Sequence, residues 1–282
     1  MQASVSPPLA YLRVLTIAGS DSGGCAGIQA DLKTFQALGC FGMSAITAIT
    51  VQNTVGVRAI HAVPLDILQG QIDAVLEDIG ADAIKIGMLH APEVAELVAA
   101  ALDRHGARQV VFDPVMVAAG GDRLIADETV EVLVQRMFPR ATLITPNLDE
   151  AALLLGRPLR SAEDLEPAAR ELVALGAPAV LLKGGHLAGE TVVDVLATAQ
   201  GEVRRYESPR IDTRNLHGAG CTLSSAVAAR LAHGDRLHKA VEAARRYVWQ
   251  ALSAGAPVRT GGGRGPLNHA FDPQPVRAAA RG

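Results

Sequence analysis

The sequence predicts an α/β fold in which a mostly parallel sheet lies between helices and carries an antiparallel hairpin at one edge. Short runs rich in branched aliphatic residues alternate with segments of helical periodicity along most of the chain. The alternation then gives way to two apolar runs joined by a polar linker, and two long helical segments follow. Such alternation is typical of right-handed βαβ units, whose strands lie parallel.

The aliphatic runs predict buried strands, because strands covered on both faces are apolar almost throughout. These runs are Val14 to Ala18, Ser44 to Val51, Ala83 to Ile86, Val110 to Phe112, Leu143 to Thr145 and Ala179 to Leu182. The helical segments between them are opened in several cases by Pro or Asp and closed by Gly. They are Gly27 to Leu38, Leu65 to Ile79, Pro92 to Arg104, Glu128 to Arg136 and Glu163 to Leu175.

The pattern changes after Leu182. The runs Val192 to Leu196 and Glu202 to Tyr206 flank a polar linker, which predicts the edge hairpin. Two helices are then expected, roughly Ala219 to Ala232 and Arg236 to Ser253. No internal repeat is evident, so we expect a single domain over residues 11–273 with flexible ends at 1–10 and 274–282.

Charge and cysteine content narrow the possible functions. The net charge is −3 and the charged residues are scattered, so nucleic acid is not an expected partner. The first residues do not resemble an export signal, and no stretch reaches about 18 apolar residues, so neither export nor membrane insertion is expected. The three cysteines lack CxxC spacing, which argues against a disulfide framework or structural zinc and favours the cytoplasm.

Ligands of open α/β sheets bind beyond the carboxyl ends of the strands, and four such segments carry unusual chemistry. The first, Gly19 to Gly27, is glycine-rich and leads into a helix with Asp31 and Lys33. It is neither GxxxxGK[ST] nor GxGxxG, so a flexible turn is an equal interpretation. The second contains Gln52 and Asn53, whose carboxamides suit the edge of a heterocycle but are also ordinary turn formers.

The third segment follows the strand at Leu143 and contains Asn147 and Glu150. Their spacing fits two oxygen ligands that hold Mg²⁺ through its waters, and it fits a plain helix N-cap equally well. The fourth, Asn215 to Thr222, is a glycine-rich turn at the start of a helix, where successive N–H groups create an anion hole for a transferring phosphoryl group. Cys221 stands where a side chain should take the acceptor's proton, although a structural thiol is the alternative.

Together these segments resemble the hydroxymethylpyrimidine and phosphomethylpyrimidine kinases of thiamine synthesis, within the ribokinase-like superfamily. The motifs that carry the resemblance span about Val14 to Phe271 and are Ala18 to Lys33, Gln52 to Thr54, Lys85 to Leu89, Asp113 to Met116, Thr145 to Asn147, Lys183 to His186, His217 to Thr222 and Gly263 to Phe271. The resemblance implies a three-layer α/β/α sandwich and a homodimer. It also implies transfer of the ATP γ-phosphate to 4-amino-5-hydroxymethyl-2-methylpyrimidine and then to its monophosphate at the same site.

The resemblance also implies roles for individual residues. Residues expected at the pyrimidine are Gly19, Ala26, Asp31, Gln52 and Met88. Residues expected at ATP are Lys183, Asn147 and Thr213, those expected at Mg²⁺ are Asp113 and Glu150, and those expected at the transferring phosphoryl group are Gly218, Ala219, Gly220 and the base Cys221. Whether a monovalent cation assists is left open.

Three residues depart from the family pattern: Cys25 replaces a glycine, and Leu216 and Ala219 each replace a threonine. Leu216 exchanges a hydroxyl near the phosphates for an apolar group, which predicts weaker ATP binding or a shifted loop. A pyridoxal kinase is the nearest rival, although Gln52 and Met88 favour the pyrimidine. A pyrimidine-binding protein without transfer activity is a further alternative.

Overall fold

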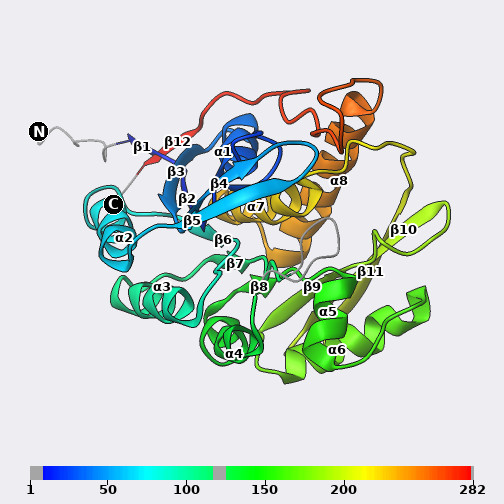
Figure 1. Ribbon diagram of the computed structural model, residues 1–282, viewed down its shortest axis with the longest axis horizontal. Helices are drawn as coiled ribbons and strands as arrows, with labels where there is room; N and C mark the ends of the chain where they lie inside the picture. Colours follow the sequence, from blue (N-terminus) through cyan, green and yellow to red (C-terminus); the bar gives the residue numbers. More distant parts are fainter. Residues whose placement is uncertain (1–8, 117–124, 281–282) are drawn as a thin grey trace, which may run out of the picture.

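The computed structural model describes residues 9–116 and 125–280, and it places an eight-stranded sheet between two layers of helices (Figure 1). In spatial order the strands are β11 (Val203–Pro209), β10 (Thr191–Thr198), β9 (Ala179–Lys183), β8 (Leu143–Ile144), β7 (Val110–Phe112), β6 (Ala83–Ile86), β2 (Arg13–Ala18) and β3 (Phe41–Ile46). The six strands from β9 to β3 are parallel, and β10 and β11 form the antiparallel edge hairpin. The predicted fold class is therefore confirmed.

The helices divide between the two faces of the sheet. One face is covered by α2 (Leu65–Asp78), α3 (Pro92–Arg104), α4 (Asp127–Val132), α5 (Leu148–Leu155) and α6 (Leu165–Ala174). The other is covered by α1 (Gly27–Ala37), α7 (Ala219–Ala232) and α8 (Leu237–Gly255). Each face of the sheet packs against its helices in a separate hydrophobic core, and successive side chains of a strand point into opposite cores. In β2, Leu15 and Ile17 pack toward α2 and α3, whereas Val14 packs toward α1 and α7. None of the helices in residues 9–116 and 125–280 is long and apolar enough to cross a membrane.

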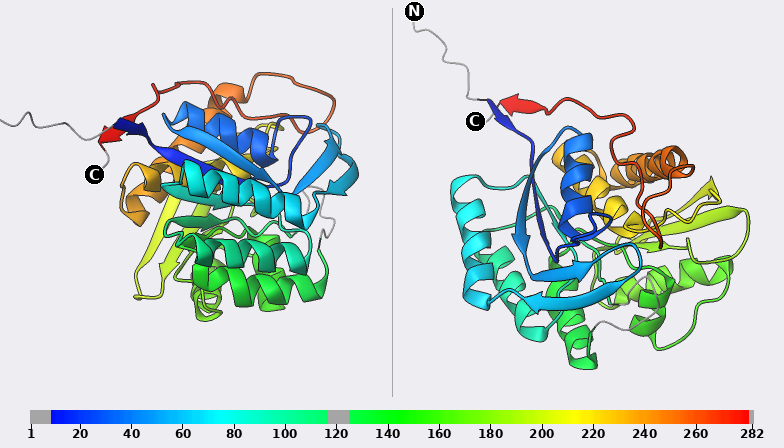
Figure 2. Two further views of the ribbon diagram at one scale, coloured as in Figure 1. Left: turned by 90° about the vertical axis from the view of Figure 1, so that its left-hand side faces the viewer. Right: turned by 45° about the horizontal axis from the view of Figure 1, so that its top comes forward.

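The run Ser44 to Val51, predicted as one strand, is divided between two. Strand β3 ends at Ile46, and β4 (Ala48–Gln52) leaves the main sheet to pair with β5 (Val57–Ala62) as an antiparallel ribbon. The break occurs at Thr47, whose N–H donates to the Ala18 carbonyl and whose own carbonyl accepts the Val63 N–H. Figure 2 shows the ribbon standing away from the sheet.

The helix predicted over Glu128 to Arg136 also differs in detail. After α4 the chain passes through a π-helical turn (Leu133–Met137) and a 3₁₀ turn (Phe138–Arg140). Pro139 has no N–H to continue the α-helical pattern, which ends the segment there. A 3₁₀ turn (Ala162–Asp164) likewise precedes α6.

Part of the ends expected to be flexible is held in place. Strand β1 (Leu9–Tyr11) pairs antiparallel with β12 (Ala278–Ala280), and the two ends of the described chain lie side by side (Figure 2). The N–H of Gln274 donates to the Ala37 carbonyl and that of Arg277 to the Gly39 carbonyl. The two ends are thus paired where they are described, residues 1–8 and 281–282 lie outside the described part of the chain, and the expectation of flexible ends stays a prediction.

A row of polar residues crosses the sheet at its carboxyl edge, on the face that α7 covers. Each stands two positions after an aliphatic residue that packs under α7, as Asp113 does after Val111 and Lys183 after Leu181. The members of this polar row are Thr16, Lys85, Asp113, Thr145 and Lys183. All but Lys183 are buried. The fold thus gathers charged groups beneath the first turn of α7.

Candidate functional site

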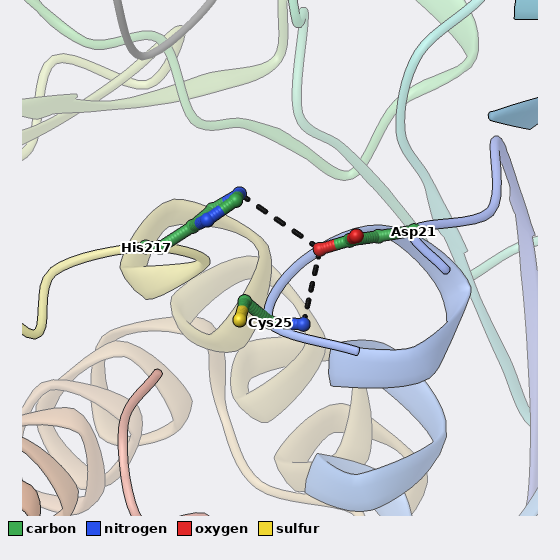
Figure 3. Close-up of side chains that lie close together, drawn as sticks. All are labelled: Asp21, Cys25 and His217. Carbon is green, nitrogen blue, oxygen red and sulfur yellow. Dashed lines mark hydrogen bonds and ion pairs between the residues drawn. The ribbon is translucent and has the colours of Figure 1, made fainter. Parts of the chain in front are cut away.

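The glycine-rich loop between β2 and α1 is held by the carboxylate of Asp21. Its Oδ1 accepts the N–H of Gly23 at 2.8 Å, and its Oδ2 accepts the N–H groups of Cys25 at 3.0 Å and Ala26 at 2.8 Å (Figure 3). Asp21 is 1% exposed, so these bonds replace lost contacts with water. The loop therefore has one defined shape, and the flexible-turn interpretation is not supported.

The same loop is joined to the β4–β5 ribbon. The hydroxyl of Ser22 donates to the Gln52 carbonyl at 2.7 Å and accepts the Gln52 N–H at 2.8 Å. The hydroxyl of Ser20 accepts the Thr50 N–H, and Thr50 Oγ1 donates to the Ser20 carbonyl. This double connection fixes the position of Gln52 relative to the loop.

The side chain of Gln52 reaches toward the segment that precedes α7. Its Nε2 lies 3.2 Å from Nε2 of His217, which makes the histidine the acceptor in this contact. His217 Nε2 also lies 3.8 Å from Oδ2 of Asp21 (Figure 3). His217 belongs to the predicted glycine-rich turn, although no individual role was predicted for it, and it connects the ribbon, the first loop and α7.

Gly19 and Met88, both expected at the pyrimidine, are neighbours. A Cβ at Gly19 would lie 2.9 Å from Cε of Met88, so a larger residue would displace the methionine. Thr47 Oγ1 donates to the Met88 carbonyl at 3.0 Å, which fixes the chain after β6. Ala26 lies against Gly218, whose Cβ would come within 3.2 Å of the Ala26 Cα. The structure thus brings Gly19, Met88, Ala26 and Gln52 to the carboxyl edge of the sheet.

The anion hole predicted at Gly218 to Cys221 forms the first turn of α7. Gly218 is the N-cap, with a φ of 85° that disfavours any side chain, and a Cβ there would lie only 1.8 Å from the Cys25 carbonyl oxygen. The N–H groups of a first turn have no intrahelical acceptor, so they are available to an anion. A Cβ at Gly220 would lie 3.2 Å from Nζ of Lys183, so this turn faces that ammonium.

Lys183 and Asp113 form a buried ion pair beside this turn. Nζ of Lys183 donates to Oδ1 of Asp113 at 2.8 Å, and Thr145 Oγ1 donates to the same oxygen at 2.9 Å. Burial alone would raise the pKa of Asp113, but the ammonium groups of Lys183 and Lys85 outweigh burial and lower it. Asp113 is therefore an ionised hard-oxygen donor.

Asn147 and Glu150 form a reciprocal capping box at the start of α5. Asn147 Oδ1 accepts the Glu150 N–H at 2.9 Å, and Glu150 Oε2 accepts the Asn147 N–H at 2.8 Å. Burial raises the pKa of Glu150 to about 7, although Lys183 opposes the rise. The N-cap interpretation is therefore correct for the geometry. It leaves the carboxylate beside Lys183 and Asp113, where oxygen donors suited to Mg²⁺ gather.

Asp31, expected at the pyrimidine, lies beneath the site instead. It is 0% exposed, its Oδ2 accepts from Thr16 at 2.6 Å and from Lys85 Nζ at 2.9 Å, and its Oδ1 accepts from Ser225 at 2.7 Å. A carboxylate with these partners has no surface for a substrate, so the placement corrects that expectation. Its partner Lys85 was missed, although a lysine inside an otherwise aliphatic strand is an unusual signal.

The residues before α7 are held by bonds within a local turn and to the C-terminal part of the chain. Thr213, expected at ATP, is half-buried, and its Oγ1 accepts the Asn215 N–H at 3.1 Å within a local turn. Asn215 itself donates to the carbonyls of Gly255 and Val258, which joins this segment to the C-terminal part of the chain. Leu216 is 44% exposed, so its side chain does not fill the site.

Comparisons with known proteins agree on one family. The family model for phosphomethylpyrimidine kinase matches residues 21–268. The hydroxymethylpyrimidine/phosphomethylpyrimidine kinase of Rhizobium meliloti is 50% identical over 256 residues, which are 90% of this chain and 96% of that protein. The Bacillus subtilis protein of the same name is 45% identical over 261 residues, or 93% and 96% of the two chains. The thiamine biosynthesis bifunctional protein ThiED of Geobacter sulfurreducens is 49% identical over 94% of this chain, which spans 53% of that longer protein.

Solved structures give the same fold. Phosphomethylpyrimidine kinase of Clostridium difficile superposes with a TM-score of 0.76 at 42% identity and covers 85% of this chain and 99% of its own. Bacillus subtilis pyridoxal kinase in an ADP complex superposes with a TM-score of 0.86 at 39% identity, covering 93% and 98%. The pyrimidine and pyridoxal kinases therefore share this scaffold.

Proposed function

The chain belongs to the phosphomethylpyrimidine kinase family, and on that basis we propose that it is the hydroxymethylpyrimidine/phosphomethylpyrimidine kinase of thiamine biosynthesis. It transfers the γ-phosphate of ATP to 4-amino-5-hydroxymethyl-2-methylpyrimidine and then to the resulting monophosphate. The observation that carries the proposal is the first turn of α7. It faces Lys183 and Asp113 on one side, and the loop and ribbon that position Gln52 on the other.

The phosphoryl end of the site is assigned to the anion hole and Lys183. The N–H groups of Gly218 to Cys221 bind the equatorial oxygens, where charge is spread in the transition state. That of Ala219 donates to the Leu216 carbonyl at 3.2 Å and would exchange this partner for the phosphate. Lys183 adds a fixed positive charge next to Gly220. Asn147 and Thr213 are assigned to the nucleotide. Before ATP binds, Lys183 and Asn147 already have defined partners in Asp113 and Glu150.

Asp113 and Glu150 are assigned to Mg²⁺, and their chemistry fits it. Both are buried carboxyl groups, and each interacts electrostatically with the other and with Lys183. Asp113 and Glu150 would hold the ion, which would supply positive charge to neutralise part of the charge of the phosphate oxygens. Lys183 keeps Asp113 ionised, so the donor is available in its anionic form.

The pyrimidine end is assigned to Gln52, Gly19, Ala26 and Met88. The carboxamide of Gln52 can both donate and accept, which matches the exocyclic amine and ring nitrogen of an aminopyrimidine. Gly19 gives a flat ring close access to the backbone, with Met88 beside it. Cys221, at the end of the anion hole, takes the proton of the acceptor hydroxyl.

The substrate is tested by comparing turnover of the hydroxymethylpyrimidine, its monophosphate and pyridoxal, with ADP formation as the readout. We expect both pyrimidines to be phosphorylated with higher kcat/KM than pyridoxal. The high TM-score to pyridoxal kinases keeps that rival in the comparison. A preference for pyridoxal would overturn the substrate assignment, and pyrimidine binding without ADP production would identify a non-catalytic protein.

We also propose a homodimer, formed through the outer face of the β4–β5 ribbon. Ile49 and Val51 lie on the same face of β4 and are 51% and 54% exposed. Apolar side chains grouped on a narrow ribbon favour burial against another protein surface. The described cysteines are all free, which supports the cytoplasm as the location.

A further inference from the structure

Lys85 is a fully buried ammonium whose position points to a part in phosphoryl transfer. Its side chain is 0% exposed, and it pairs with the equally buried Asp31 at 2.9 Å. Burial alone would lower the pKa of Lys85, but Asp31, Cys221 and Asp113 together outweigh burial and raise it, so the lysine is charged. A buried ion pair seldom adds net stability over an apolar pair of similar size, so such a pair invites a functional explanation.

The pair lies one helical turn below Cys221. Ser225, which donates to Asp31 Oδ1, stands four residues after Cys221 on the same side of α7. In the same way, Asp31 stands four residues after Gly27 on α1, and the backbone of Gly27 lies close enough to Cys221 to lower the pKa of its thiol. Helices α1 and α7 therefore contact each other at two levels that are one helical turn, about 5.4 Å, apart. Gly27 lies next to Cys221 at the site, and Asp31 lies next to Ser225 one turn further into the protein.

The side chain of Lys85 extends along the sheet toward this site. A Cβ at Gly87, two residues further along the chain, would lie 2.9 Å from Nζ of Lys85. Side chains two apart share one face of a strand, so the ammonium has passed along that face to the carboxyl edge. The absence of a side chain at Gly87 leaves the space that the ammonium occupies.

Asp31 fixes the position of Lys85 but does not fully neutralise the electrostatic effect of the Lys85 ammonium on Cys221. Oδ2 of Asp31 also accepts from Thr16, and Oδ1 accepts from Ser225, so three donors share its negative charge. Burial raises the pKa of the Cys221 thiol to about 11, and among the charged groups Lys85 has the largest effect, which opposes that rise. Asp31 and Asp113 act in the opposite direction, and Lys183 also faces the thiol from β9.

We propose that Lys85 is a positioning residue for phosphoryl transfer, whose ammonium, held by Asp31 beneath the first turn of α7, stabilises the thiolate form of Cys221, which takes the proton of the acceptor hydroxyl. This inference rests on the proposed role of Cys221 as the base. It explains how Cys221, next to anionic phosphates, can reach the thiolate form that accepts a proton. It also assigns a function to Lys85 as a member of the polar row at the carboxyl edge of the sheet.

The test measures the thiol directly, as the rate at which iodoacetamide labels Cys221 across pH, with the labelled peptide resolved by mass spectrometry. In Asp31→Asn the amide can still bond Lys85, Thr16 and Ser225, so we expect the labelling pKa to fall. In the double variant Lys85→Met/Asp31→Asn both buried charges are absent, and we expect that pKa to rise by about one unit above the wild type. A purely structural role predicts no such opposite shifts.

Turnover provides the second readout. In the double variant we expect kcat to fall about tenfold or more while KM for the pyrimidine changes little, because no group that touches substrate has changed. Asp82→Asn serves as the matched control, since Asp82 pairs with Arg13 at the opposite edge of the sheet, and its labelling profile should match the wild type. Circular dichroism identifies any variant that does not fold, and either folded variant alone decides the question.

The outcomes separate this inference from the proposed function. A labelling pKa in the folded double variant equal to the wild-type value overturns the role of Lys85. A wild-type enzyme that phosphorylates no pyrimidine refutes the proposed function, and the labelling experiment still reports on the coupling between Lys85 and Cys221.

Discussion

The ammonium of Lys183 lies 2.8 Å from Oδ1 of Asp113, so the cation that faces the anion hole and a carboxylate assigned to Mg²⁺ neutralise each other before a nucleotide binds. Their side chains are 13% and 3% exposed, which keeps water from screening the attraction. Binding of the nucleotide must therefore share or replace this pairing. The resting site is arranged so that neither charge is left alone in a dry environment.

Replacing Lys183 by Met should impair both catalysis and stability. We expect kcat/KM for ATP to fall about a hundredfold, because one preorganised positive group is lost at the phosphoryl position. Asp113 would also be left buried without its cation, at a cost of about 3–5 kcal/mol. Steady-state kinetics and urea unfolding measure the two effects, and Lys239→Met, which breaks the exposed pair with Glu242, serves as the control. An unchanged kcat/KM for ATP would contradict the assignment.

Replacing Cys221 by Ala should reduce kcat about a hundredfold or more, the usual contribution of a general base. Cys40→Ala is the matched control, because Cys40 is a buried thiol near the Ala229 carbonyl and away from the anion hole. The rate of ADP formation at saturating substrate is the measurement. If the Cys221 variant turned over at the wild-type rate, the thiol could not be the base.

Gly218→Ala should be far more damaging than Gly234→Ala. Both glycines have positive φ, 85° and 88°, which costs an alanine about 1–2 kcal/mol. At Gly218 the new methyl group would also overlap the Cys25 carbonyl oxygen, whereas nothing lies within 4 Å at Gly234. We expect Gly234→Ala to lose only that conformational energy in thermal unfolding and to keep its activity. Similar losses in the two variants would show that the contact with Cys25 is unimportant.

Glu150 should give the enzyme a pH dependence. Its pKa is raised by burial from 4.5 to about 7, so the native state binds a proton that the unfolded state releases. The associated stability is complete below about pH 4.5 and is lost as the pH rises through about 7. Glu150→Gln keeps an acceptor for the Asn147 N–H and should remove this dependence, so its unfolding free energy should fall less than that of the wild type between pH 5 and 8.

Glu150 should also affect Mg²⁺ binding. Ionisation near pH 7 creates the anionic oxygen donor, so the Mg²⁺ concentration needed for half-maximal activity should fall as the pH rises. In Glu150→Gln that requirement should be higher and nearly independent of pH. A Mg²⁺ requirement that fell with pH to the same extent in both proteins would assign the effect to another group.

Introducing charge on the ribbon should separate the proposed dimer. Ile49→Glu combined with Val51→Glu places two like charges per chain on the outer face, and we expect a monomer in sedimentation velocity. Leu175→Glu alters an apolar residue of similar partial exposure, 38%, at the far end of α6 and should leave the assembly unchanged. A double variant that sediments like the wild type would place the interface elsewhere.

Much of the fold could be predicted because its determinants are local. The runs Val110 to Phe112 and Pro92 to Arg104 coincide with β7 and α3, since buried aliphatic strands and a proline-started amphipathic helix are visible over a few residues. The split at Thr47 could not be predicted in this way. It depends on hydrogen bonds to Ala18 and Val63, which the chain makes only after folding.

The site residues also divide into those that local sequence predicts and those that depend on contacts between distant segments. The capping box of Asn147 and Glu150 spans four residues, and the glycine-rich start of α7 is equally local. Lys85 and Asp31 are 54 residues apart, and an isolated charge in either segment gives no sign of its partner. Asp31 was expected at the substrate because its neighbours belong to the loop motif, but the helical period turns its side chain inward.

The pairing of β1 with β12 brings the two described ends together at the amino edge of the sheet, opposite the anion hole. The described part of the chain therefore begins and ends in adjacent strands. A short peptide linker could join the ends, and a circular permutant opened at an exposed turn such as the one at Gly106 should retain the kinase site. For the same reason another domain can be appended at either end without obstructing substrates, which accords with the Geobacter relative, where the matching segment is about half of a longer bifunctional chain.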